Sequence, residues 1–186
     1  MFPLVMFVGL LTAHDFQQQT IFRRIHALPG FTSVVEVKDL RPGEIHRWLR
    51  EMDNSRFKKW HAAHREYRVI RKTPDYIGGR FYFREIVGEF EISGTWEVIF
   101  AEPPDTIIFK RLWQPVYWSL ILTGTETGTL VTNDMRYGTG WEWVDRSLKR
   151  FVERFYLTPE IQTAIDLHDR EEFLMLGTVI NNQNNN

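Results

Sequence analysis

The sequence predicts an α+β domain in which one curved antiparallel sheet wraps around a long C-terminal helix. From residue 65 the hydrophobic pattern has a period of two, and short turns rich in Gly and Pro separate the apolar runs. Short turns between consecutive strands predict an antiparallel meander. A strand and two short helices precede the meander and a helical period follows it, so the space between helix and sheet is the expected ligand cavity.

The expected elements follow in chain order. Residues 32–38 are rich in Val and are predicted as the first strand. Residues 42–52 carry an apolar stripe at helical spacing, and a second short helix is expected from Ser55, its predicted N-cap. The last helix is expected over residues 141–180, with an interruption near Leu157 where a Thr-Pro-Glu sequence restarts it. The strands of the meander are expected near 66–72, 79–87, 89–100, 105–112, 114–123 and 128–138.

The 186 residues suit one domain over residues 32–180, preceded by an N-terminal arm or extension over 1–31. A disordered polar tail is expected over 181–186 because Asn dominates it. The apolar segment Met1–Ala13 has no Lys or Arg before it and is shorter than the roughly 20 residues that span a bilayer. We therefore favour a packed arm, or a start codon assigned too early, over a signal segment.

Composition excludes several classes of site and partner. The net charge of -1 provides no general basic field for nucleic acid, and no membrane span is predicted. The absence of Cys excludes disulfides, thiolate zinc sites and Cys nucleophiles, and fits the cytoplasm. Aromatic residues make up 15% of the chain, which suits either a wide core or a cavity for a small hydrophobic or aromatic ligand. The sequence leaves open whether the chain forms a homodimer.

Two histidines lie on the expected apolar stripe of the second short helix. Phe57, Trp60, His61 and His64 fall at i, i+3, i+4 and i+7, so both imidazoles are predicted to point inward. A lone His on such a face is usually a core residue, whereas two of them favour a functional site.

The C-terminal helix carries a His and a Glu one turn apart on its apolar face. His168 and Glu172 share one spot on that face because residues four apart are neighbours on a helix. A buried carboxylate needs compensation from a His, an Arg or a metal. The expected stripe comprises Ile161, Ala164, Ile165, His168, Glu172, Met175 and Val179.

The strand over 79–87 adds a second carboxylate. Phe81, Phe83 and Glu85 share one face, so Glu85 lies inside the cavity if that face looks inward. The alternative is an exposed Glu85 that pairs with a basic residue on the next strand. Two His with carboxylates and no Cys suit a catalytic zinc site, and iron(II) or manganese would accept the same set.

The segments Lys59–His64 and Gly79–Glu85, followed by the His168-x-x-x-Glu172 pair, resemble the START-like, Bet v 1-like superfamily (SRPBCC). Within it they resemble the diacetylphloroglucinol hydrolase (PhlG) and phloretin hydrolase branch. The resemblance covers about residues 32–180 and implies a helix-grip fold, with two short helices after the first strand. It also implies a zinc ion bound by one His, one Glu and the later His–Glu pair, and hydrolysis of a carbon–carbon bond between an acyl group and a phenolic ring.

Carried over residue by residue, the resemblance makes Glu85, His168 and Glu172 metal ligands, with either His61 or His64 as the fourth. The histidine that does not bind metal is the expected proton shuttle. The hypothesis is therefore a zinc-dependent hydrolase of a small aromatic or acyl-phenolic compound, with Trp60, Phe81 and Phe83 as pocket walls. The alternatives are a non-catalytic hydrophobic-ligand or lipid-binding START-like protein and a metal-free polyketide cyclase-like enzyme.

Overall fold

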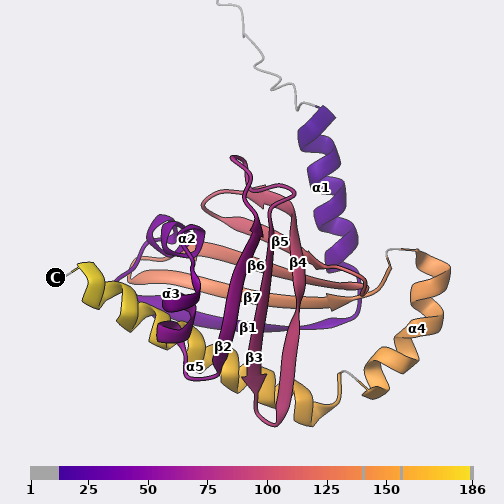
Figure 1. Cartoon of the computed structure of the whole chain (residues 1–186). Coiled ribbons are helices and arrows are strands. Elements are labelled where there is room, and N and C mark those ends of the chain that lie inside the picture. The colour runs from indigo at the N-terminus through magenta and orange to yellow at the C-terminus, as the bar shows by residue number, and fades with distance from the viewer. Residues whose placement is uncertain (1–12, 140, 156, 185–186) are drawn as a thin grey trace, which may run out of the picture.

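The structure is a computed structural model that describes residues 13–139, 141–155 and 157–184 (Figure 1). Apart from Ala13, the apolar segment Met1–Ala13 lies outside the described residues. The elements are α1 (Ala13–His26), β1 (Gly30–Lys38), α2 (Pro42–Arg50), α3 (Asn54–Trp60), β2 (His64–Arg71), β3 (Arg80–Val87), β4 (Phe90–Glu102), β5 (Thr106–Arg111), β6 (Val116–Gly124), β7 (Gly128–Tyr137), α4 (Glu142–Phe155) and α5 (Pro159–Asn184).

The seven strands form one antiparallel sheet in the order β1-β7-β6-β5-β4-β3-β2. Strands β2 to β7 each pair with the next along the chain, which confirms the predicted meander. β1 pairs with β7, from Gly30 opposite Arg136 to Lys38 opposite Gly128. The connection through α2 and α3 therefore takes the chain from one edge of the sheet to the other, and the predicted α+β class is confirmed.

Helix α5 covers the inner face of the sheet and lies against β1 (Figure 1). Phe173, Leu176 and Ile180 of α5 are buried in a core shared with α2, α3 and the inner faces of the strands. The helix and the sheet approach closely at Gly177, where an added Cβ would lie 2.9 Å from Cγ1 of Val37 on β1. Glycine at this position lets the helix lie close to the sheet.

Two details of the short helix α3 differ from the expectation. Its N-cap is Asp53, whose side chain accepts a hydrogen bond from the Arg56 amide at 2.8 Å, so the helix begins before Ser55. It ends at Trp60, so His61 is its C-cap and His64 is the first residue of β2. The predicted helical stripe through both histidines is therefore wrong, although both side chains are buried.

The stripe on α5 also departs from its predicted course. It is correct as far as Glu172, but beyond that point the buried residues are Phe173, Leu176 and Ile180, whereas Met175 is 42% exposed. A helical stripe drifts around the helix because 3.6 residues complete one turn. The helix also continues to Asn184, into the residues expected to form the polar tail.

Helix α1 was not predicted, and its C-terminal end packs on the outer face of the sheet. Its residue Ile25, with Leu28 just after it, packs on Phe100, Ile108 and Tyr117. The break between α4 and α5 falls where the sequence predicts it: α4 ends at Phe155 and α5 begins at Pro159. Within the described part of the chain, no helix combines the length and the apolar character that a bilayer span requires.

Candidate metal centre

Two imidazoles and two carboxylates from β2, β3 and α5 meet at one point inside the sheet. His64 and Glu85 are cross-strand partners on β2 and β3. Nε2 of His64 lies 3.5 Å from Oε2 of Glu85 and 3.2 Å from Oε1 of Glu172. Nε2 of His168 lies 3.8 Å from Oε2 of Glu85 and 3.6 Å from Oε2 of Glu172. Glu85 therefore points inward, and the structure decides the alternative that the sequence left open.

The ring of His64 presents an unprotonated nitrogen to the two carboxylates. Its Nδ1 lies 2.8 Å from the carbonyl oxygen of Phe57, and a carbonyl can only accept, so Nδ1 carries the proton. Burial lowers the pKa of His64 to about 4, against the opposing charge of Glu85, which keeps the ring neutral near pH 7. The Nε2 atoms of His64 and His168 are both buried without a hydrogen-bond partner among the described residues. Free imidazole nitrogens beside carboxylates are the donors that a divalent metal takes.

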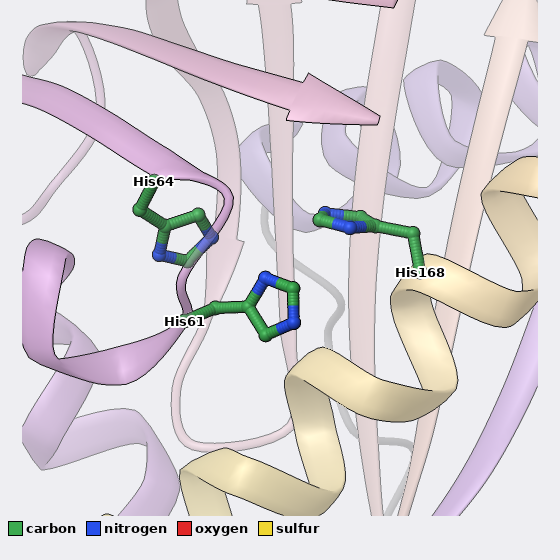
Figure 2. Close-up of side chains that lie close together, drawn as sticks. All are labelled: His61, His64 and His168. Atoms are coloured by element: carbon green, nitrogen blue, oxygen red, sulfur yellow. The ribbon is translucent and has the colours of Figure 1, made fainter. Parts of the chain in front are cut away.

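His61 lies in the same cluster but presents the other tautomer. The amide of Ala63 donates to its Nδ1 at 3.2 Å, so the neutral ring carries its proton on Nε2. That Nε2 lies 3.9 Å from Oε2 of Glu171, whose side chain is 71% exposed. Burial, followed by the charges of His168 and His64, lowers the pKa of His61. Figure 2 shows the three rings converging, with His61 on the connection from α3 to β2, His64 at the start of β2 and His168 on α5.

The two carboxylates of the cluster lie beside the same two histidines, His64 and His168. Burial, and next the charge of Glu85, raises the pKa of Glu172 well above its ordinary value. Burial alone would lower the pKa of His168, but Glu85 and Glu172 outweigh it and raise that pKa. The cluster is thus one in which a proton or a metal cation must balance two adjacent carboxylates. Trp60 supports it by donating from Nε1 to the Glu172 carbonyl at 2.7 Å.

The four side chains stand beside a large apolar cavity between α5 and the sheet. The cavity has a volume of about 1190 Å³, and Glu85, His168 and Glu172 line it. His61 and His64 do not line it and approach the cluster from the side of α3. The predicted wall residues Trp60, Phe81 and Phe83 all line the cavity, with further aromatic walls from Trp96, Phe109 and Trp118.

No family model matches the chain, and no curated protein matches its sequence. Solved structures match its fold at low identity. The KanY protein has a TM-score of 0.59 at 13% identity, over 83% of this chain and 98% of that chain. Ara h 8.0201 has a TM-score of 0.56 at 8% identity, over 82% and 97%. The di-domain ARO/CYC protein BexL has a TM-score of 0.55 at 10% identity, over 89% of this chain and 53% of that one.

The chain has the Bet v 1-like, helix-grip fold. At such low identities the similarity establishes the fold and no activity. The helix-grip fold places the cavity between the C-terminal helix and the sheet, which is where the candidate metal centre lies.

One buried polar residue of this helix-grip cavity is missing from the predicted site. Asp169 is 4% exposed and lines the cavity, and it accepts hydrogen bonds from Ser33 on β1 and Asn133 on β7. Burial raises the pKa of Asp169 to about 6. The sequence held a signal for it: Asp169 lies four residues after Ile165 and four before Phe173, within an otherwise apolar helical series.

Proposed function

We propose that the chain is a metal-dependent hydrolase of a small hydrophobic, aromatic or acyl-phenolic compound. The metal, zinc by preference, would be held by His64, Glu85, His168 and Glu172. One observation carries the proposal: two buried Nε2 atoms, without a hydrogen-bond partner among the described residues, face the buried carboxylate of Glu172 and the half-buried carboxylate of Glu85 at 3.2 to 3.8 Å. Two imidazole nitrogens and carboxylate oxygens without thiolate suit zinc, and iron(II) or manganese would fit the same donors.

The tautomers assign different roles to the two histidines near α3. His64 is the ligand, because the Phe57 carbonyl holds its proton on Nδ1 and directs the free Nε2 to the carboxylates. His61 is the proton shuttle, because its Nε2–H lies between the cluster and the exposed Glu171. Its ring centroid is 5.0 Å from that of His168, so a proton can pass between solvent and the cluster over a short path.

The cavity determines what kind of molecule would react. A bound cation would polarise a carbonyl group and promote ionisation of a water molecule at neutral pH. The aromatic walls would hold the apolar part of the ligand, with its carbonyl directed to the cation that Glu85 and Glu172 would help to bind. Stacking on Phe81, Phe83 and Trp118 favours a flat ring over an aliphatic chain.

The proposal is tested by measuring metal in the purified chain after incubation with zinc, manganese or iron(II) and removal of excess. About one metal ion per chain is expected, and His168→Ala and Glu172→Gln should each abolish stoichiometric binding. Glu171→Gln is the matched control, since Glu171 neighbours Glu172 but is largely exposed. A chain that takes up none of these metals, and whose His168→Ala variant is as stable as the unaltered protein, would contradict the proposal.

A metal-free ligand-binding protein or cyclase-like enzyme is the second candidate. It is favoured by the raised pKa of Glu172, because a protonated Glu172 could donate a hydrogen bond to a ligand without any metal. Treatment with a strong chelator separates the two candidates. Turnover or ligand binding that survives complete metal removal would support this second function over the hydrolase.

A further inference from the structure

The cavity contains a second polar cluster, on the side of β1 and β7, which the metal centre does not use. It consists of Asp169, Asn133 and Trp118, all of which line the cavity. Asp169 and Asn133 are 4% and 8% exposed, so both polar groups are held among apolar walls. Such burial is unfavourable unless hydrogen bonds replace those lost to water.

The hydrogen bonds of this cluster leave some acceptor sites of the Asp169 carboxylate unused. Trp118 donates from Nε1 to Oδ1 of Asn133, and Asn133 in turn bonds to Asp169. Ser33, which does not line the cavity, donates its hydroxyl to Oδ2 of Asp169. An ionised carboxylate has about four acceptor sites, and these two donors fill only part of them. Asp169 can therefore accept a further hydrogen bond at the cavity wall.

We propose that Asp169, held in place by Asn133 and Ser33, accepts a hydrogen bond from a hydroxyl group of the ligand and so selects hydroxylated aromatic compounds. The inference rests on the proposed function, in that the cavity takes an aromatic ligand. Asp169 lines the same cavity as His168 and interacts electrostatically with His168 and Glu85, so the hydroxyl would be bound close to the metal centre. The metal centre would then bind a carbonyl group of the ligand, and Asp169 would bind a hydroxyl group on the same ring.

A neutral hydroxyl fits this position better than an ammonium group. Trp118 turns the Nε1 edge of its indole toward the cluster, and a ring edge is electropositive. One of its faces is stacked on Phe109 at a centroid distance of 4.6 Å. A cation would also lie near the metal ion that the proposed function requires, and like charges repel.

The experiment compares three probes by isothermal titration calorimetry: 2-naphthol, 2-methylnaphthalene and 2-naphthylmethylamine. The unaltered chain should bind 2-naphthol about tenfold more tightly than the other two, since only 2-naphthol offers a neutral donor. Asp169→Asn should reduce this preference to about twofold or less, and Asn133→Leu should weaken it too. Asp166→Asn is the control, because this carboxylate lies on the same helix but pairs with Arg170 at the surface.

Metal content is measured on the same samples, so that failure of the subsite is distinguished from failure of the metal centre. An unaltered chain that binds the three probes equally, or binds none of them, overturns the subsite whatever its metal content. Tighter binding of 2-naphthylmethylamine overturns it in favour of a cation site. A preference for 2-naphthol that persists in Asp169→Asn overturns the role of Asp169, and thermal unfolding of each variant shows that it is folded.

Discussion

At the scale of single residues, His61 and His64 adopt different tautomers because different backbone groups face their Nδ1 atoms. His64 faces a carbonyl, that of Phe57, and so carries its proton on Nδ1. His61 faces an amide, that of Ala63, and so carries its proton on Nε2. Neither partner could be inferred from residue spacing, since both depend on where α3 ends and how the chain turns into β2.

The tautomers predict unequal effects of removing each ring. His64→Ala should weaken zinc binding by more than about 100-fold, because it removes a ligand from between two carboxylates. His61→Ala should leave zinc affinity within about tenfold of the unaltered chain and lower turnover instead. Competition with a chromogenic chelator measures the affinities. Equal loss of zinc in the two variants would show that both rings are ligands.

Asp169 is a buried cavity residue that the predicted site does not include. The predicted stripe passes through His168 and Glu172, which are buried, and then through Met175, which is not. Asp169 belongs to the adjacent series Ile165, Asp169 and Phe173, and the packing of α5 against β1 buries it. The His168–Glu172 pair was found because four residues make nearly one turn, which holds for any helix.

At the scale of elements, the position of α5 depends on one close approach. A Cβ added at Gly177 would lie 2.9 Å from Cγ1 of Val37 on β1, so a larger residue there requires a shift of the helix or of Val37. His168 and Glu172 lie on the same helix. Helix α5 therefore carries two of the four candidate metal ligands, and its packing on β1 fixes the distance between these ligands and the sheet.

Gly177→Leu is expected to lower the free energy of unfolding by about 2 kcal/mol, because the added side chain must push α5 away from Val37. Zinc affinity should fall in the same variant, since the two ligands on α5 move with the helix. Urea unfolding and chelator competition measure the two effects. Thr178→Leu, at an exposed neighbouring position, should leave both nearly unchanged.

The sequence predicted the type of most elements because their apolar periods are regular, as in β3 and β4. It missed α1, whose residues 13–26 mix polar and apolar side chains and gain their partner only from the outer face of the sheet. The pairing of β1 with β7 could not be predicted from the apolar pattern, because the two strands are far apart in the chain and no short turn joins them.

At the scale of the whole molecule, one buried carboxylate joins three distant segments on the outer face. Asp134 of β7 accepts a hydrogen bond from Thr32 of β1 at 2.6 Å, forms an ion pair with Arg136, and lies 3.0 Å from Nδ1 of His26 of α1. Burial alone would raise the pKa of Asp134, but the bonds from His26, Arg136 and Thr32 outweigh it and hold the pKa at about 2.

A carboxylate whose pKa is lower in the folded chain stabilises it above the unfolded pKa, near 4, and loses that effect as the pH falls toward 2. Asp134→Asn should therefore lower the free energy of unfolding by about 2 kcal/mol at pH 7. The difference between the two proteins should shrink between pH 4 and pH 2. Chemical unfolding across that range checks it, and a difference independent of pH would contradict the role of the charge.

A cavity of about 1190 Å³ that is partly open to solvent is large for a chain of 186 residues, and its apolar interior affects how the molecule responds to compression. Unfolding abolishes such a hollow, so the unfolded state occupies less volume and hydrostatic pressure favours it. We expect this chain to unfold at lower pressure than proteins of equal size with filled cores, and a bound aromatic ligand to raise the midpoint pressure. Tryptophan fluorescence in a high-pressure cell would measure both midpoint pressures, and the difference between them would show whether a ligand occupies the cavity.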